Sequence, residues 1–357
     1  MSKELKKIRN LIDNIDKDLI SLLNKRARLA ENIKHEKDKI GDTDIFRPER
    51  EAQILRKLNS LNKGPLSEKH LYIIFREIMS ACLSLERKMK VSCLGPEMSY
   101  SNLAMIRYFG SSIQRKFSNS IRDIFSDVEN DQIDYGVVPI ENSSQGSIKE
   151  TLDQLVSSKL AICGEVNLKI KHCLLSPVKS LAKITTVYAH DQAFLQCNAW
   201  LQKNLPNITR KSLSSNSAAV KRIKNTKNSA AIASEYSSLF YGVPVLKKNI
   251  NDYSDNTTRF IVIGKRGVSM SGIDKTSILV TLNNESGSLL KLIKPLSLNK
   301  ISMSKIESIP TKMNNWEYMF LIDIDGHSDN TKVKKVLKDI QKNSIFFKVL
   351  GSYPVNN

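Results

Sequence analysis

The stretch DYGVVPIENSSQGSIKETLDQL, residues 134–155, carries the clearest structural signal in the chain. Its apolar start predicts a buried strand that is interrupted at Pro139, and a helix is expected to begin after Gly146. Polar side chains fill the turn between them, from Glu141 to Ser144. Open α/β sheets bind ligands beyond the carboxyl ends of their strands, and the N-terminus of a helix suits an anion. The stretch therefore predicts an α/β domain with a ligand site at this turn.

The surrounding residues 91–266 alternate short apolar strands with helices, which is typical of an α/β fold. Strands are predicted at VSCL (91–94), YGVVPI (135–140), AICGEVNL (161–168), TTVYA (185–189), AAIAS (230–234) and TRFIVIG (258–264). Helices are predicted at residues 101–108, 148–158, 192–204 and 217–224. A break in the pattern near residues 169–175 and a return near Thr258 predict two lobes with a cleft between them.

Residues 1–90 are predicted to be entirely helical. Residues 3–38 contain neither Gly nor Pro, and their apolar residues recur at helical spacing. At about 1.5 Å per residue this first helix is about 54 Å long, far longer than such a domain is wide. We therefore expect a second copy of the chain to cover much of it. A second helix is predicted to begin at Pro48, and a third to cover residues 71–86.

The C-terminal residues 276–357 follow the order β-α-β-β-α-β, which is that of a ferredoxin-like module. Residues 267–275 are predicted to be a linker. The sequence thus predicts three domains, at residues 1–90, 91–266 and 276–357, and a chain of 357 residues is long enough for them.

Composition excludes several classes of protein. There is no run of about 18 apolar residues and no apolar segment at the N-terminus, so neither a membrane span nor a secretory signal is expected. The five cysteines are scattered and show no CxxC or zinc spacing, which predicts free thiols in a reducing cytoplasm. Without a His/Cys cluster, a GxGxxG motif or a P-loop, neither a metal nor a nucleotide cofactor is implied.

The net charge of +19 raises the alternative of a nucleic-acid partner. The basic excess is spread over all three regions, with no concentrated stripe or tail. We interpret it as a compositional bias whose positive field attracts small anionic substrates, and expect no nucleic-acid partner.

The first predicted helix places cations on its apolar stripe. Arg26 and Lys37 are eleven residues apart, which is three helical turns, so both lie on the face of Leu22 and Ile33. Arg9 points elsewhere. Buried cations favour an anionic ligand, but long basic side chains also extend along apolar surface to reach water, and the pattern leaves both interpretations open.

Several motifs resemble one enzyme family. VVPIEN (137–142) is similar to the prephenate dehydratase signature, and CLGPEMSYS (93–101), GEVNLKIKHCLLS (164–176), VYAHDQAFLQC (187–197), SNSAA (215–219), YGVPVL (241–246) and NTTRF (256–260) follow in the family's order. FREIMSACLSLE (75–86) resembles the chorismate mutase domain that precedes the dehydratase in bifunctional enzymes. ESGSLLKLIKPLSL (285–298) and IESIP (306–310) resemble phenylalanine-binding segments of ACT regulatory domains. The resemblance covers about residues 5–353.

The resemblance implies a cytoplasmic, homodimeric enzyme of phenylalanine biosynthesis. Its fold would combine an all-α mutase domain in an intertwined dimer, an α/β two-lobed, periplasmic-binding-like dehydratase domain and an α+β ferredoxin-like ACT domain. The substrates would be chorismate and prephenate, and L-phenylalanine would be the effector.

For the mutase, the resemblance implies one pocket with a set of charged residues and a contribution from the other subunit. Arg9 would be that contribution, which agrees with its different helical face. Lys37 and Glu86 would meet the ether oxygen of chorismate, and Glu86 must be protonated to donate a hydrogen bond there. The pocket residues would be Arg26, Lys37, Arg50, Glu51 and Glu86.

For the dehydratase, the resemblance implies that Thr258 donates a hydrogen bond to the leaving hydroxyl of prephenate. His172 is a weaker candidate. The remaining pocket residues would be Glu141, Asn142, Ser143, Gln196, Arg259 and Phe260. The chain departs from the family pattern at Met98, Ala189, Asp191 and Asn216, where the family carries Gly, Ser, Pro and Thr. We expect an active, slower dehydratase.

For the effector site, the resemblance implies two segments, made of Gly287, Ser288, Leu289 and Leu290 and of Glu307 and Ser308. Ile309 occupies the position of an arginine in the usual ESRP motif. Because an isoleucine cannot supply a charged planar donor, we expect inhibition by phenylalanine to be weak or absent.

Three alternatives remain from the sequence. The substitutions leave only one of the two activities, or the chain is a non-catalytic amino-acid-binding regulator, or it binds nucleic acid. Intact Arg26, Lys37 and Thr258 argue against the regulator.

Overall fold

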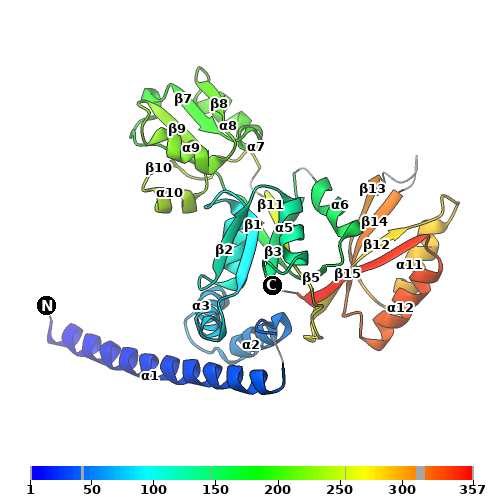
Figure 1. The fold of residues 1–357 in the computed structure, drawn as a ribbon. Helices are drawn as coiled ribbons and strands as arrows, with labels where there is room; N and C mark the ends of the chain where they lie inside the picture. Colours follow the sequence, from blue (N-terminus) through cyan, green and yellow to red (C-terminus); the bar gives the residue numbers. More distant parts are fainter. Residues whose placement is uncertain (1, 42–43, 145, 254, 311–317, 356–357) are drawn as a thin grey trace.

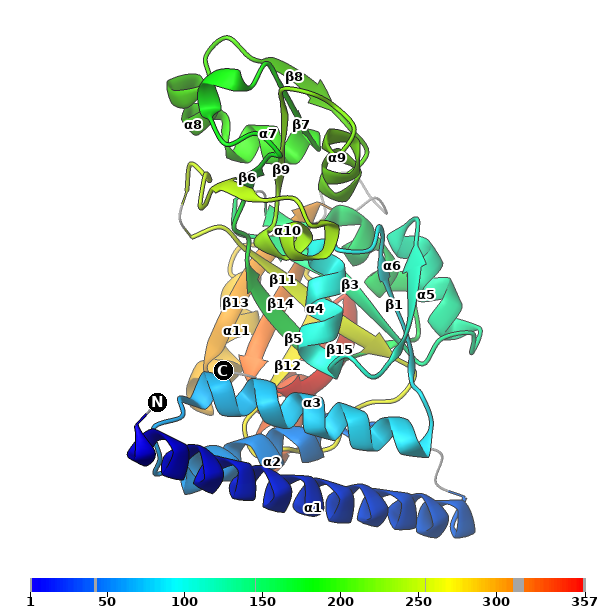
Figure 2. The ribbon, with the colours of Figure 1, turned by 90° about the vertical axis from the view of Figure 1, so that its left-hand side faces the viewer.

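Three helices form the N-terminal region of the computed structural model, which describes residues 2–41, 44–144, 146–253, 255–310 and 318–355. They are α1 (Lys3–Lys39), α2 (Pro48–Leu61) and α3 (Glu68–Glu86). The Ser2 side chain caps α1 by accepting a hydrogen bond from the Leu5 backbone N–H. Figures 1 and 2 show α1 as a long, straight helix beside α3. No residue of α1 is buried. The predicted long helix is thus confirmed, and it leaves its apolar stripe uncovered within one chain.

The first lobe of the α/β region is a mixed sheet in the order β2-β1-β3-β11-β5, with the short β4 paired to β3. β1 pairs in parallel with β2 and β3, whereas β11 runs antiparallel to β3 and β5. Its strands are β1 (Lys90–Leu94), β2 (Gln114–Ser118), β3 (Tyr135–Asn142), β4 (Gly146–Ser147), β5 (Ala161–Lys169) and β11 (Thr257–Gly264). Its helices are α4 (Tyr100–Phe109), α5 (Ile121–Glu129) and α6 (Lys149–Ser157).

The second lobe has its own sheet, in the order β10-β6-β9-β7-β8. The strands are β6 (Cys173–Leu175), β7 (Thr186–Ala189), β8 (Thr209–Ser212), β9 (Ser229–Ala233) and β10 (Val245–Lys247). The helices are α7 (Asp191–Gln196), α8 (Asn198–Asn204), α9 (Asn216–Ile223) and α10 (Glu235–Tyr241), with one 3₁₀ turn, η1 (Leu181–Lys183). The chain enters this lobe after β5 and leaves it before β11, as the predicted break and return required (Figure 2).

One predicted helix was wrong in its extent. Residues 192–204 form two helices, α7 and α8, that meet at the buried Cys197. The carboxylate of Asp252 accepts hydrogen bonds of 2.9 Å from the backbone N–H groups of Ala199 and Trp200, at the start of α8. A distant side chain thus caps a new helix start, which explains the break.

The C-terminal module contains a four-stranded antiparallel sheet in the order β13-β14-β12-β15. Its elements are β12 (Asp274–Thr281), α11 (Ser288–Leu298), β13 (Met303–Pro310), β14 (Tyr318–Asp325), α12 (Thr331–Lys342) and β15 (Phe346–Pro354). The predicted β-α-β-β-α-β order and ferredoxin-like topology are therefore present.

The C-terminal sheet packs directly against the sheet of the first lobe, while α11 and α12 cover its other face (Figure 1). Leu279, Leu321 and Tyr353 of the module share one core with Ile261 and Ile263 of β11. Gly351 shows how close the approach is, because a Cβ atom there would lie 2.2 Å from the carbonyl oxygen of Ile162. The C-terminal module therefore packs directly against the first lobe.

Candidate active sites

A cavity of about 540 Å³ lies where the two lobes meet. The first lobe supplies one wall, the second lobe supplies the other, and the crossing segment supplies His172. The lining includes Pro139, Asn142, Ser147, Ile170, His172, His190, Gln196, Ser215, Asn216, Ser217, Ser234, Thr258 and Phe260. Among the described lining residues none is Lys, Arg, Asp or Glu.

Helix N-termini take the place of charged side chains around this cavity. Ser99, Ile148 and Ser215 are the N-cap residues of α4, α6 and α9, and all three line it. Ser99 and Ser215 use their side chains to cap backbone N–H groups in the first turn. Because each helix carries a partial positive charge at its N-terminus, the cavity suits an anion.

Thr258 and Asn142 meet at the wall formed by β11 and β3. They are register partners, and the Asn142 amide donates to the Thr258 hydroxyl oxygen at 2.7 Å and to the Asn256 side-chain oxygen at 3.1 Å. The Asn142 side-chain oxygen in turn accepts from the Ser144 backbone N–H at 3.0 Å. Since Asn142 occupies an acceptor position of the Thr258 oxygen, the Thr258 proton is left to donate to a ligand.

Gln196 and His172 lie side by side in the cavity wall, with His172 Nε2 and Gln196 Oε1 2.8 Å apart. Burial lowers the pKa of His172 below its ordinary value, and the hydrogen bond that its Nε2–H donates to Gln196 offsets this only in part. The lowered pKa favours the neutral form of His172, which contacts Gln196 in the cavity wall.

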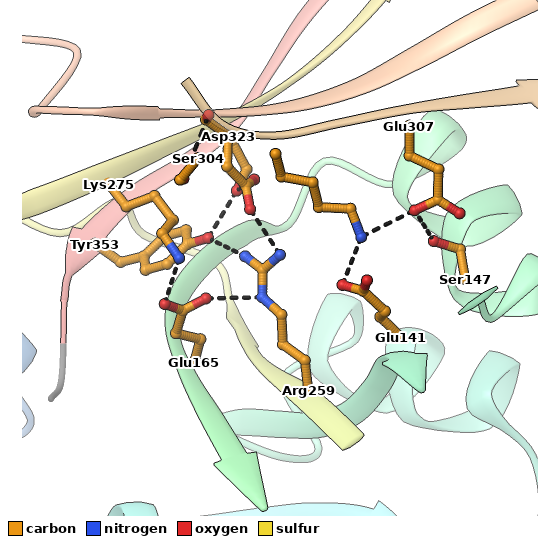
Figure 3. Close-up of polar contacts among 11 residues, drawn as sticks. Glu141, Ser147, Glu165, Arg259, Lys275, Ser304, Glu307, Asp323 and Tyr353 are labelled. Atoms are coloured by element: carbon orange, nitrogen blue, oxygen red, sulfur yellow. Dashed lines mark hydrogen bonds and ion pairs between the residues drawn. The ribbon is translucent and has the colours of Figure 1, made fainter. Parts of the chain in front are cut away.

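Three predicted substrate contacts point elsewhere in the structure. Arg259 and Glu141 project from the opposite face of β11 and β3, toward the C-terminal module (Figure 3). Ser143 accepts from the Thr257 backbone N–H at 2.9 Å and donates to the Asp255 carbonyl at 3.2 Å. Successive residues of a strand face opposite sides, so Thr258 and Phe260 line the cavity and Arg259 between them does not. The expectation that Arg259, Glu141 and Ser143 contact substrate is corrected accordingly.

The departures from the family pattern have local structural consequences. Met98 lines the cavity with φ of 67°, in the left-handed region that favours glycine, which is the residue of the family pattern at this position. Asn216 lines the cavity and accepts from the His190 backbone N–H at 2.9 Å. Ala189 is fully buried, and Asp191 accepts from the Ser212 hydroxyl. Thr258, Asn142 and Phe260 are not disturbed by any of these contacts.

Four of the predicted mutase residues, Arg26, Lys37, Glu51 and Glu86, lie where α1 and α2 pack against α3. The Lys37 ammonium lies 3.1 Å from the Glu86 carboxylate, joining α1 to the end of α3. Glu51 is buried and paired with Arg76, and burial raises its pKa despite the neighbouring Arg76 and Arg26. Among the candidates, Arg26 and Lys37 are half-buried, whereas Arg50 is exposed.

Sequence reasoning missed Arg76. It is buried, its guanidinium pairs with Glu51, and it donates to the Tyr72 hydroxyl at 2.9 Å. A charged residue on the apolar face of the third predicted helix was the signal that could have revealed it. Arg9 is exposed on α1, seventeen residues from Arg26, which is about 25 Å along a helix. Arg9 therefore lies far from the Arg26 of its own chain.

The predicted effector residues are divided between two places. Gly287 takes φ of 83° as the N-cap of α11, where Leu289 and Leu290 are exposed. Glu307 instead faces the first lobe, accepting from the Ser147 hydroxyl at 2.5 Å and pairing with Lys305 at 2.9 Å. Partial burial opposes ionisation of Glu307, but these two partners outweigh it and lower its pKa. Ser308 is exposed, and Ile309 packs against the core shared with the first lobe.

Fold and site together define a class of protein. A two-lobed α/β domain holds a cavity that is lined by helix N-termini and Thr258, and it lies between a helical domain and a ferredoxin-like module. The family model for prephenate dehydratase matches residues 91–268, and that for chorismate mutase type II matches residues 8–87.

Full-length relatives agree with this class. The chain is 40% identical to the bifunctional chorismate mutase/prephenate dehydratase of Stutzerimonas stutzeri, with 98% of each chain covered. It is 41% identical to that of Aquifex aeolicus, with 99% of this chain and 98% of the relative covered. The crystal structure of a prephenate dehydratase from Arthrobacter aurescens, in complex with L-Phe, is 28% identical with a TM-score of 0.68, covering 75% of this chain and 90% of that one. The chain belongs to the family of bifunctional chorismate mutase/prephenate dehydratases, as its motifs predicted.

Within the described ranges, none of the helices combines the length and apolar character needed to cross a bilayer.

Proposed function

We propose that residues 1–90 convert chorismate to prephenate and that residues 91–266 convert prephenate to phenylpyruvate, in phenylalanine biosynthesis. The observation that carries the second assignment is the Asn142–Thr258 pair in a cavity lined by helix N-termini. The five cysteines are all free thiols, which supports a reducing cytoplasm. Residues 276–357 form the third, ACT-like domain.

The dehydratase reaction removes a carboxylate and a hydroxyl from the same ring. The electron pair of the breaking C–CO₂ bond moves into the ring and expels the hydroxyl, which takes up a proton supplied by solvent and leaves as water. Thr258 donates its hydrogen bond to that hydroxyl, and Asn142 fixes the direction of the donor. The N-termini of α4, α6 and α9 hold the retained carboxylate, while Phe260 packs in the wall of the site.

The mutase reaction is a pericyclic rearrangement that needs no acid, base or nucleophile. The protein must hold the chorismate dianion folded and stabilise charge that develops on the ether oxygen. Arg26 and the Arg9 of a second copy bind the carboxylates, with Arg50 and Glu51 closing the pocket. Lys37 meets the ether oxygen, and Glu86, 3.1 Å from Lys37 in the structure, would donate there only in its acid form.

The mutase site is completed by a homodimer. Eleven large apolar residues of α1 are between 41% and 62% exposed in a single chain. A stripe of this size along a helix of 37 residues indicates that another protein surface packs against it. Since Arg9 lies far from Arg26 of its own chain, a second α1 packed against the first supplies it to the pocket.

A charge placed on that stripe tests the dimer. Leu19→Asp is expected to lower mutase kcat/KM by about tenfold or more, because a carboxylate buried at the interface is unpaired. Light scattering should give the unaltered protein twice the chain mass of 40.3 kDa. Leu239→Asp makes the same change at an exposed leucine of α10 and should leave mutase activity unchanged. A monomeric protein with full mutase activity would contradict the proposal.

Phenylalanine is expected to inhibit weakly or not at all. Ile309 replaces an arginine donor and packs against the shared core, so it offers a ligand no charged partner. Dehydratase rates measured against increasing L-phenylalanine should stay near the uninhibited rate through the micromolar range, with L-leucine as the control. Half-inhibition at micromolar L-phenylalanine would show that the effector site does not need this arginine.

A further inference from the structure

Arg259 holds the catalytic strand to the C-terminal module. Its guanidinium makes three contacts: Nε with Glu165 at 2.8 Å, Nη1 with Asp323 at 2.6 Å, and Nη2 with the Tyr353 hydroxyl at 2.8 Å. Glu165 belongs to β5 of the first lobe, whereas Asp323 and Tyr353 belong to β14 and β15 of the module (Figure 3). One side chain thus ties three strands from two domains together.

The cluster around Arg259 is closed and buried. The side chains of Arg259, Glu165 and Asp323 are only 10%, 3% and 2% exposed. Lys275 completes the charge balance through its 2.7 Å contact with Glu165, so two cations face two carboxylates. Burial alone would lower the pKa of the Arg259 guanidinium, but Tyr353, Glu165 and Asp323 outweigh it and raise the pKa. Three of the five N–H groups of the guanidinium are held in this cluster, and Arg259 is not among the described residues that line the cavity.

The hydroxyl of Ser277 also contacts the cluster around Arg259. Ser277 of β12 donates to Asp323 at 2.5 Å, and its oxygen lies 2.7 Å from that of Tyr353. A buried network whose members are all satisfied is rigid, and removing one member leaves others unpaired. The position of Arg259 is therefore fixed mainly from the C-terminal module.

Strand β3, which pairs with β11, is also joined to the C-terminal module by an ion pair. Glu141 of β3 pairs with Lys305 of β13 at 2.5 Å, and Lys305 also pairs with Glu307. Asn142 follows Glu141 just as Thr258 precedes Arg259, and Glu141 and Arg259 are register partners. Both members of the Asn142–Thr258 pair thus have a direct chain neighbour anchored in the module.

We propose that the C-terminal module is part of the framework of the dehydratase site. Arg259, Asp323 and Tyr353 are positioning residues that fix where the hydroxyl of Thr258 lies. The inference rests on the proposed role of Thr258. Because misplacing a catalytic group by about 1 Å costs up to about 100-fold in rate, loosening this cluster slows the chemical step rather than substrate binding.

The test uses the full chain, and circular dichroism together with the mutase rate checks that each variant is folded. Asp323→Asn should lower dehydratase kcat by about tenfold or more, with KM for prephenate within about twofold. Tyr353→Phe keeps the ring and removes one hydroxyl, so a smaller loss of about threefold is expected. Mutase rates should stay within about twofold in both. Asp325→Asn is the matched control, because Asp325 lies on the same strand and is exposed.

Two results would overturn the proposal. Asp323→Asn and Tyr353→Phe with unchanged dehydratase kcat would show that the module does not position the site. Arg259→Lys that raises KM alone, with both module variants unaffected, would assign Arg259 to substrate binding. If Asp323→Asn also loses mutase activity because it misfolds, the dehydratase kcat of Tyr353→Phe decides whether the module positions the site. Full dehydratase activity in Thr258→Ala would instead remove the underlying site assignment.

Discussion

Thr258→Ala is expected to lower dehydratase kcat by about 10²- to 10⁴-fold, the range for losing a positioned proton donor. The alanine keeps the Cβ atom and removes the hydroxyl that accepts from Asn142 at 2.7 Å. The Asn142 amide keeps its bond to Asn256, so the strand pair remains in place. Steady-state rates with prephenate measure the loss, and the chorismate mutase rate should be unchanged.

The neighbouring threonine provides the control. Thr257 is the register partner of Lys169, lies one position outside the cavity wall and donates to the Asp255 carbonyl at 3.5 Å. Thr257→Ala should therefore retain dehydratase activity within about twofold, since only one exposed hydrogen bond is lost. Dehydratase activity as high as that of the unaltered protein in both Thr258→Ala and Thr257→Ala would mean that neither hydroxyl assists the leaving group.

Lys37→Ala is expected to lower mutase kcat by about 10²- to 10³-fold, because it removes the ammonium group that stabilises charge developing on the ether oxygen of chorismate. The change also leaves the buried Glu86 carboxylate without its partner at 3.1 Å. Chorismate disappearance gives the rate. The dehydratase rate on added prephenate should be unchanged, since its cavity has no lining residue from α1.

Lys39→Ala tests whether any cation on α1 would have the same effect. Lys39 lies two residues further along and is exposed, with an ion pair to Glu36 at 2.6 Å. Exposed pairs of this kind contribute little, so mutase activity should stay within about twofold. A similar loss in both variants would point to the general charge of the helix rather than to a pocket.

The fold could be predicted largely because its strands and helices are buried on defined faces. The long α1, the two-lobe crossing and the C-terminal β-α-β-β-α-β order all follow from apolar periodicity and from Gly and Pro placement. β2 and β8 were missed because they are short edge strands, QRKFS and TRKS, with hardly an apolar residue. The break at Cys197 could not be predicted, because the capping Asp252 is more than 50 residues away.

The site was predictable in part. Thr258, Asn142, Phe260 and Gln196 meet in one cavity as the motifs implied. Arg259 was misjudged although strand alternation already placed it on the other face from Thr258. Its partners Glu165 and Tyr353 are each 94 residues distant, and Asp323 lies on another domain, so only the folded chain brings them together.

The most direct test of two active sites on one chain is a time course with chorismate as the sole substrate. Chorismate, prephenate and phenylpyruvate are followed together in the unaltered protein and in Thr258→Ala. The unaltered protein should consume chorismate and form phenylpyruvate, while Thr258→Ala should consume chorismate at the same rate and accumulate prephenate. Unconsumed chorismate, or prephenate accumulating in the unaltered protein without phenylpyruvate, would contradict the account.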